Sequence, residues 1–357
     1  MFLIKVLVVE DSPAKREHLL RIFASDRNML VIATAGSGAE ALQQVQRHQP
    51  DVVTMDSDLP ILNGLEATRL IMESCPVPII IVADSGSPGE VASTFDAVDA
   101  GALAVLPFPP AASAHGHAAA VQELLRTVRV MSEVKVVRRW VHARRGAVRQ
   151  PPETGFVKEP TGLFRIVAVG ASTGGPLALA VLLGGLSKDF PAPIVIVQHM
   201  ANGFMRGFVD WLAPSSALPV HIATHGERLL PGHVYMAPDD VQMNVNRQER
   251  IALVDAPAEN GLRPSVSCLF RSVCDAYGRD AAAVLLTGMG RDGAQELRLL
   301  KDKGATTFAQ DKESSIVHGM PGEAIRLDAA TLVLPPEKIA AALVNMASAR
   351  NENGRSA

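Results

Sequence analysis

One stretch of the chain combines an apolar strand, a glycine turn and a single serine at the start of a helix. Residues 165–178 read Arg-Ile-Val-Ala-Val-Gly-Ala-Ser-Thr-Gly-Gly-Pro-Leu-Ala. The run Ile166–Val169 predicts a strand and Pro176 favours the first turn of a helix, so the turn between them presents the hydroxyl of Ser172. Main-chain N–H groups and the helix dipole stabilise negative charge there. A serine beside such donors is half of an acyl-transfer site, which also needs a base and an orienting acid.

Two later apolar strands are followed by residues that could serve as the base and the orienting acid. The next strand ends at His199, and the apolar run 281–287 is followed by Asp292. Apolar strands separated by helical stretches predict a parallel sheet, in which sites form at the carboxyl ends of the strands. We therefore predict that Ser172, His199 and Asp292 meet as nucleophile, general base and orienting acid.

A glycine turn after a strand also occurs in proteins that bind nucleotide phosphates. The segment Gly170–Gly175 lacks the G-x-G-x-x-G pattern of dinucleotide-binding folds, and Gln198 and His199 stand where an acid would hold a ribose. The Gly-x-Ser-x-Gly pattern around Ser172 matches a nucleophile elbow, although hydrolases of that fold have the order serine, acid, histidine. We therefore favour a serine hydrolase with another chain order over a nucleotide-dependent oxidoreductase.

Three acidic residues follow other predicted strands near the N-terminus. Glu10 and Asp11 end the first strand and Asp56 ends the third. Gathered at one edge of a sheet, these carboxylates repel one another unless a hard cation joins them, and Mg²⁺ prefers such oxygen ligands. Asp56 is then a candidate nucleophile toward a phosphoryl group, since carboxylates form aspartyl phosphates. A single acid in a loop is usually only solvated, but three at strand ends favour a magnesium site.

The elements that must position these acids alternate regularly between strand and helix. We expect strands over Leu3–Val9, Leu30–Ala33, Val52–Met55, Ile79–Val82 and Leu103–Leu106. We expect helices over Ala14–Ala24, Ala39–Arg47, Gly64–Met72 and Glu90–Ala100. This alternation predicts an α/β fold whose first half is a five-stranded parallel, doubly wound sheet. The second half is predicted to be a parallel-sheet α/β domain as well.

The segment between the two halves is rich in helix breakers and basic residues. Prolines and glycine interrupt Pro107–His117, whereas Val121–Val137 has the apolar spacing of a helix. The basic run Arg138–Arg145 is more typical of a solvated helix end than of a binding surface, and residues 143–162 are expected to form a linker. The predicted organisation is a domain over 1–120, a helix and linker over 121–163, and a second domain over 164–350.

Composition and charge narrow the class of protein. The 357 residues are 48% hydrophobic, which allows two domains with sizeable cores. A net charge of −3 and an aromatic content of 4% argue against a nucleic-acid partner. The 3 cysteines lack disulfide or metal-binding spacing, which fits the reducing cytoplasm. The N-terminus lacks the pattern of a signal peptide, and no apolar run reaches membrane-spanning length, so we expect a cytoplasmic protein.

The first half resembles a response-regulator receiver domain over residues 4–120. The resemblance rests on Glu10-Asp11, Met55-Asp56, Pro60 and Asn63-Gly64. It implies that Asp56 accepts a phosphoryl group, that Glu10, Asp11 and Asp56 hold Mg²⁺, and that a chemotaxis-type histidine kinase is the phosphodonor.

Two positions depart from the receiver pattern. Ala83 stands where receivers carry Thr or Ser at the end of the fourth strand, and Phe108 stands where they carry Lys after the fifth. The hydroxyl would hydrogen-bond a phosphoryl group, and the ammonium would offset its charge of up to about −2. Asp84 and Ser85 lie near in sequence, but neither restores a cation. Unless the metal and Asp56 suffice, we expect this receiver to be phosphorylated poorly or to switch weakly.

The second half resembles the chemotaxis protein-glutamate methylesterase family, CheB, over residues 164–346. The resemblance rests on Gly170-Ala-Ser-Thr-Gly-Gly, Gln198-His-Met, Arg263-Pro-Ser, Thr287-Gly-Met-Gly-Arg-Asp-Gly and His318-Gly-Met-Pro. A receiver joined by a linker to such a domain is also the layout of that family. Gln242 stands where the family often has His.

The resemblance implies an activity and a role for each residue of the esterase. It implies hydrolysis of γ-glutamyl methyl esters, and deamidation of particular glutamines, on the cytoplasmic helices of membrane chemoreceptors. The protein would therefore meet the membrane only through these receptors. Ser172 would be the nucleophile, His199 the base and Asp292 the orienting acid, with the main-chain N–H groups of Thr173 and Met289 as oxyanion donors. No metal or organic cofactor is implied for the esterase.

Two functions and one regulatory question stay open at the level of sequence. The chain is either a regulated methylesterase or a catalytically silent adaptor with a degenerate receiver. In the family, the unphosphorylated receiver covers the esterase cleft and phosphorylation releases it. With Ala83 and Phe108, the receiver either inhibits until a partner binds or never inhibits.

Overall fold

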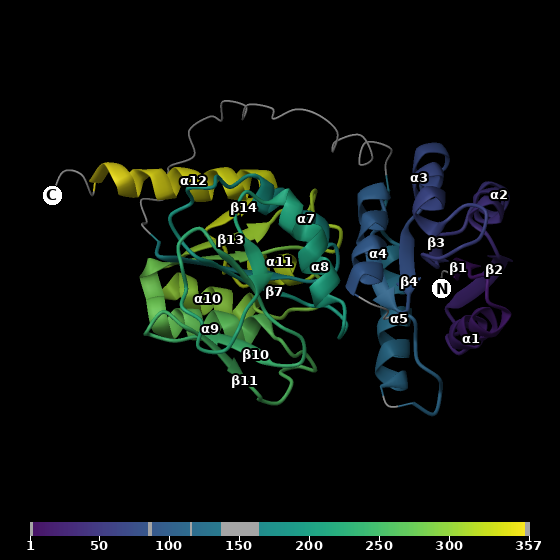
Figure 1. Cartoon of the computed structure of the whole chain (residues 1–357), viewed down its shortest axis with the longest axis horizontal. Coiled ribbons are helices and arrows are strands. Elements are labelled where there is room, and N and C mark those ends of the chain that lie inside the picture. Colours follow the sequence, from purple (N-terminus) through teal and green to yellow (C-terminus); the bar gives the residue numbers. More distant parts are fainter. Residues whose placement is uncertain (1–2, 85–87, 115, 137–163, 354–357) are drawn as a thin grey trace. The chain divides into compact units, whose positions relative to one another are not determined.

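The computed structural model describes residues 3–84, 88–114, 116–136 and 164–353, which belong to two compact units, Met1–Gln150 and Pro151–Ala357 (Figure 1). The basic run and the linker predicted between residues 138 and 162 lie outside the described residues. Within the described ranges, no helix combines the length and apolar character needed to cross a lipid bilayer.

The first unit is built around a five-stranded parallel sheet with the order β2-β1-β3-β4-β5. Its strands are β1 (Ile4–Val9), β2 (Met29–Ala35), β3 (Val52–Met55), β4 (Ile79–Ala83) and β5 (Ala104–Pro107). Its helices are α1 (Pro13–Ala24), α2 (Gly38–His48), α3 (Gly64–Ser74), α4 (Pro88–Ala100) and α5 (His117–Met131). The strand order reverses once, beside β1, as in doubly wound folds. The predicted five-stranded parallel α/β fold is confirmed.

Local sequence signals explain where the first three helices begin. Ser12, Ser37 and Asn63 precede α1, α2 and α3, and each side chain accepts a hydrogen bond from a main-chain N–H of the first turn. Such caps typically contribute about 1 kcal/mol each. Each predicted strand and helix up to residue 107 agrees with the structure to within two residues at either end.

The helix predicted over Val121–Val137 was wrong in its bounds. Helix α5 begins at His117, after Gly116 with φ 85°, and ends at Met131. Beyond it, Val134 and Val136 are β-branched and lower the helix propensity of that segment.

Helix α5 packs within the first unit. Of the apolar residues with the spacing of a core-facing stripe, Leu124, Val128 and Met131 are buried and Leu125 is half-buried. Arg129 forms an ion pair with Asp26, just beyond α1. A domain boundary drawn at residue 120 therefore cuts through this helix.

The second unit is built around a seven-stranded parallel sheet with the order β14-β13-β12-β6-β7-β9-β8. Its strands are β6 (Ile166–Ala171), β7 (Ile194–Gln198), β8 (Val220–Ile222), β9 (Val234–Met236), β12 (Ala281–Leu285), β13 (Thr306–Gln310) and β14 (Leu332–Leu334). An antiparallel ribbon is formed by β10 (Gln242–Val245) and β11 (Ile251–Val254). The helices are α7 (Gly175–Gly184), α8 (Met205–Leu212), α9 (Val266–Tyr277), α10 (Ala294–Asp302), α11 (Met320–Arg326) and α12 (Pro336–Asn353), with short 3₁₀ turns η1 (Ala213–Ser215) and η2 (Gly278–Asp280).

Strand β6 marks the place where the direction of strand addition changes. The chain goes from β6 to β7 and on to β8 at the edge of the sheet, and β9 then fills the place between β7 and β8. Strand β12 joins the other side of β6, and β13 and β14 extend the sheet from there. All six residues of β6 and all five of β12 are buried, as expected for strands covered on both faces. Ligands of doubly wound folds bind at the carboxyl ends of the strands beside such a point. The carboxyl ends of β7, β6 and β12 therefore meet where a site is expected.

Candidate active site and phosphoacceptor site

The register of the sheet sets Ser172 beside His199. Ala171, the last residue of β6, pairs with Gln198, the last residue of β7, and the N–H of His199 donates to the carbonyl of Ala171 at 2.9 Å. On the other side, the N–H of Ser172 donates to the carbonyl of Thr287, beyond the end of β12, at 3.0 Å. The serine therefore lies between the turns that follow β7 and β12.

Glycines allow the chain to close tightly around the serine. A Cβ atom at Gly288 would lie 2.7 Å from the Cβ of Ser172, so any side chain there would displace the serine. A Cβ atom at Gly175 would lie 2.0 Å from the Oε1 of Gln198. The amide of Gln198 fills that space, and its Nε2 donates to the carbonyl of Ser172 at 2.9 Å. These contacts fix the main chain on both sides of the hydroxyl.

His199 is hydrogen-bonded to a buried carboxylate. Its Nε2 lies 2.9 Å from Oδ2 of Asp292, and the two side chains are 9% and 2% exposed. The start of α9 holds the same carboxylate, because the N–H groups of Val266 and Ser267 donate to it at 2.7 and 3.1 Å. The hydroxyl of Ser265, the N-cap of α9, adds a contact at 3.3 Å. A helix N-terminus thus fixes the position of the acid.

This environment keeps Asp292 ionised. Burial alone would raise the pKa of Asp292. The hydrogen bond and charge of His199, with the hydrogen bonds from Ser267 and Val266, outweigh burial and hold the pKa below its ordinary value. An ionised Asp292 accepts a hydrogen bond from the N–H at Nε2 of His199, and in that tautomer Nδ1 carries the lone pair that can accept a proton.

The serine and the histidine are neighbours without a direct hydrogen bond. Among the described residues, no hydrogen bond joins the Ser172 hydroxyl to the imidazole of His199. Hydrogen bonds of this kind are often long in unliganded enzymes and shorten when substrate binds. Adjacent parallel strands lie about 4.8 Å apart. Ser172 and His199 directly follow the paired ends of β6 and β7, so they are close enough for their side chains to form such a hydrogen bond when substrate binds.

Two main-chain donors beside the serine are open. Within the described parts of the chain, the N–H groups of Thr173 and Met289 donate to no main-chain carbonyl. Thr173 follows Ser172 directly, and Met289 follows Gly288, which lies against Ser172. The N–H of Gly288, in contrast, is already used by the carbonyl of Val317 at 3.0 Å. Thr173 and Met289 are therefore available to a developing oxyanion.

Sequence reasoning missed the residues that hold the turns together. Buried Thr287 contacts the carbonyl of Thr173 at 2.9 Å through its hydroxyl, which also accepts the N–H of Val317 at 2.9 Å. Its own N–H donates to Oε1 of Gln310 at 2.7 Å. The sequence signal for Thr287 is weak, because it is one hydroxyl at the end of an apolar run.

Gln242 organises the start of α9. Its buried amide accepts the N–H of Ser265 at 2.8 Å and donates to the carbonyls of Leu262 and Pro257 at 3.2 and 3.3 Å. The side chain that departs from the family pattern thus supports the turn that holds Asp292.

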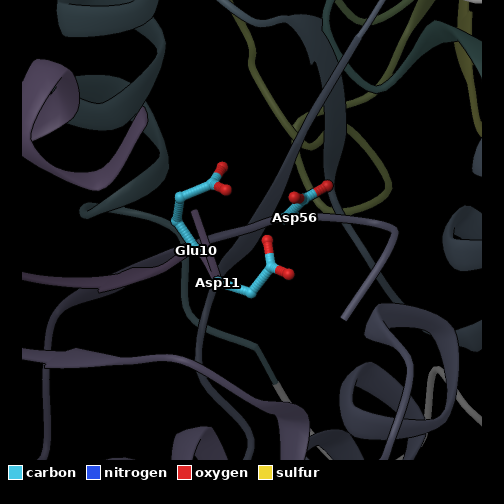
Figure 2. Close-up of side chains that lie close together, drawn as sticks. All are labelled: Glu10, Asp11 and Asp56. Carbon is cyan, nitrogen blue, oxygen red and sulfur yellow. The ribbon is translucent and has the colours of Figure 1, made fainter. Parts of the chain in front are cut away.

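The acidic cluster of the first unit lies at the carboxyl ends of β1 and β3, which are neighbours in the sheet. Figure 2 shows the side chains of its three members close together. One carboxylate oxygen each from Glu10, Asp11 and Asp56 lie within 4.8 Å of one another. Glu10 and Asp56 are buried, and Asp11 is exposed. The cluster predicted from the sequence does form.

The electrostatics of this cluster fit a divalent cation. Burial, followed by the charge of Asp56, raises the pKa of Glu10 to about 7. Burial also raises the pKa of Asp56. The raised pKa values mean that the surroundings of both carboxylates do not supply enough positive charge to balance their negative charges. A set of oxygen donors with one exposed member suits Mg²⁺, which keeps several of its waters. The two departures from the receiver pattern lie together, since the N–H of Phe108 donates to the carbonyl of Ala83 at 2.7 Å.

Comparison with known proteins finds similarity along both units. A family model for the CheB methylesterase matches residues 167–343, and one for the response regulator receiver domain matches residues 6–112. The chain is 59% identical over 354 residues to a protein from Nitrosospira multiformis that bears the name protein-glutamate methylesterase/protein-glutamine glutaminase, covering 98% of this chain and 99% of that one. A protein of the same name from Geobacter metallireducens is 50% identical and is covered to 99%.

The second unit is also similar to a solved structure. The crystal structure of the Thermotoga maritima CheB methylesterase catalytic domain superposes with a TM-score of 0.50 at 39% sequence identity. The match covers 51% of this chain and 98% of that one.

Proposed function

The chain belongs to the CheB family of protein-glutamate methylesterases, and we propose that it hydrolyses glutamate γ-methyl esters on chemoreceptors through Ser172, His199 and Asp292. It also deamidates particular glutamines of these receptors, because an amide presents the same carbonyl to the same nucleophile. The substrate helices lie in the cytoplasm, where this protein acts in chemotaxis adaptation. The observation that carries the proposal is the paired strand ends of β6 and β7, together with the 2.9 Å contact between His199 and Asp292.

The geometry suggests the order of proton transfers. Ser172 Oγ attacks the ester carbonyl while Nδ1 of His199 accepts its proton, because Nε2 is occupied by Asp292. The N–H groups of Thr173 and Met289 stabilise the oxyanion, and removal of one such donor typically costs about 2.7–4 kcal/mol. His199 then protonates the leaving methanol, or ammonia in the case of glutamine. Water hydrolyses the acyl-enzyme by the same route and leaves a carboxylate.

The receiver unit would control this activity through a phosphoryl group on Asp56. Glu10, Asp11 and Asp56 would hold Mg²⁺, which on binding would neutralise the charge of the incoming phosphoryl group. A histidine kinase of chemotaxis type would be the phosphodonor. Ala83 supplies no hydroxyl and Phe108 no ammonium, so we expect slower phosphorylation than in receivers that have both.

One assay separates the esterase from a catalytically silent adaptor. Methanol release from methylated receptor membranes is measured with the wild type and with Ser172→Ala. We expect the variant to lose roughly 10³-fold or more in rate, because the nucleophile is gone. Ser216→Ala, a serine outside the site, serves as the matched control and should keep the wild-type rate. Equal rates for wild type and Ser172→Ala would favour the adaptor.

A further inference from the structure

Lys15 of α1 occupies the side of the acidic cluster that Phe108 leaves without a lysine. Its Nζ pairs with Oδ2 of Asp84 at 2.6 Å and lies 5.3 Å from the centre of the Phe108 ring. Asp84 follows β4 and Phe108 follows β5, so both belong to the same edge of the sheet as Asp56. The ammonium therefore lies at the strand ends where phosphorylation is proposed.

The contacts of Lys15 keep it charged and close to the acids. Burial lowers its pKa, but the hydrogen bond and charge of Asp84 and the charges of Glu10 and Asp56 raise it, and the balance lies above the ordinary value. The face of Phe108 attracts the cation as well. Its side chain is 34% exposed, so it has room to change partners.

The neighbouring cation does not offer the same charge to the pocket. The guanidinium of Arg16 donates to the main-chain carbonyl of Glu10 at 2.8 Å and is thereby directed to the backbone. Burial raises the pKa of both Glu10 and Asp56, and the charge of Lys15 acts against this rise.

We propose that Lys15 supplies the positive charge that stabilises the phosphoryl group on Asp56, in place of the lysine that Phe108 replaces. The proposal rests on the role of Asp56 as phosphoacceptor. An Oδ of Asp56 attacks the phosphorus of an acyl phosphate, and the new O–P bond forms as the P–O bond to the donor carboxylate breaks. The donor carboxylate leaves with the electron pair, and no proton is transferred. The pocket gains up to about two negative charges, which the ammonium of Lys15 offsets.

The test compares two measurements on the full-length protein, because a charge and a structural role predict different results. With acetyl phosphate and Mg²⁺, we expect Lys15→Met to label at Asp56 about tenfold more slowly, a smaller loss than for a fully buried donor because Lys15 is partly exposed. With Mg²⁺ alone, calorimetry should show tighter binding in Lys15→Met, since one like charge is removed from beside the metal site. A variant that is merely misfolded loses both the labelling of Asp56 and the binding of Mg²⁺.

Three further variants serve as controls. Lys5→Met removes the same charge at the start of β1, the opposite end of the strand from Glu10, and should change neither measurement. Asp56→Asn should abolish labelling and so identifies the acceptor. Phe108→Lys in the Lys15→Met background returns an ammonium to the fifth strand and should restore most of the labelling rate.

The outcomes separate this assignment from the proposed function. If the wild type is labelled at Asp56 and Lys15→Met is labelled equally fast, Lys15 does not stabilise the phosphoryl group. The proposed role of Asp56 as phosphoacceptor is unaffected by that result. Weaker Mg²⁺ binding by Lys15→Met, or no recovery with Phe108→Lys, would also overturn the assignment. A wild type that takes no phosphoryl group overturns both the proposed role of Asp56 and that of Lys15.

Discussion

Asp292 shows how opposing effects on one residue determine the chemistry of the site. Burial disfavours its charge, but His199 and the start of α9 stabilise it, and the pKa falls below its ordinary value. The carboxylate can therefore hold one tautomer of His199 throughout the reaction. Its partners, the N–H groups of Val266 and Ser267, belong to a helix that lies far from it in sequence.

We predict that Asp292→Asn impairs both catalysis and the response of stability to pH. The amide selects the wrong tautomer of His199, so ester hydrolysis should fall about 10⁴-fold, as for the orienting aspartate of serine proteases. A depressed folded-state pKa means that the carboxylate stabilises the fold above its unfolded pKa of about 3.9 and loses this effect as pH falls through the folded value.

Urea unfolding at neutral pH and below pH 4 tests the second part. Wild type should lose more stability between these conditions than Asp292→Asn, which has no carboxylate to protonate at this position. Asp210→Asn, on the surface and 3.9 Å from Arg206, serves as the control and should behave like the wild type. The same acid sensitivity in wild type and Asp292→Asn would show that Asp292 is not stabilised in its charged form.

The sequence predicted the residues at the strand ends better than the residues that hold them. Ser172, His199 and Asp292 were identified because each follows an apolar strand, and the structure brings them to one edge of the sheet. The roles of Thr287, Gln242 and Lys15 were not predicted, because they depend on which partner the tertiary fold places beside each side chain. A hydroxyl, an amide or an ammonium has no periodic pattern from which its partner can be inferred.

At the scale of elements, strands that alternate regularly with helices were predictable, even the four-residue β3 and β5, whereas the short strands of the second unit were not. The strands β8, β9 and β14 have three residues each, and β10 and β11 have four. Such segments are too short for their hydrophobic alternation to differ from chance. The antiparallel ribbon of β10 and β11 nevertheless matters for the site, because β10 carries Gln242.

We predict that Gln242→Leu weakens the start of α9. The N–H of Ser265 and the carbonyls of Leu262 and Pro257 would lose their partners, which should lower the free energy of unfolding by roughly 1–3 kcal/mol. Ester hydrolysis should fall as well, because α9 holds Asp292. Urea unfolding and methanol release measure the two effects.

A surface glutamine supplies the control for this prediction. Gln248→Leu, in the exposed turn between β10 and β11, should change stability by less than about 0.5 kcal/mol. If Gln242→Leu is as stable and as active as Gln248→Leu, then the buried amide has no part in positioning α9.

At the scale of the whole molecule, linking two units on one chain raises the effective concentration of each for the other to about millimolar, so even a weak affinity of the receiver for the esterase would suffice for inhibition. We therefore predict that a protein beginning at Gly162 releases methanol faster than the unphosphorylated full-length chain. Phosphorylation at Asp56 should bring the full-length chain toward the rate of the shorter protein. Equal rates for the two unphosphorylated proteins would mean that the receiver never inhibits.

The positions of His199 and Asp292, which lie 93 residues apart in the chain, also determine when activity first arises. At about 5–20 residues per second, a ribosome adds that stretch in roughly 5 to 20 s. A nascent chain whose serine and histidine have already emerged from the ribosome still lacks the aspartate. Its β12 has also yet to join the sheet beside β6. Proteins abandoned midway through translation should thus be unable to attack esters, however well their finished portion has folded.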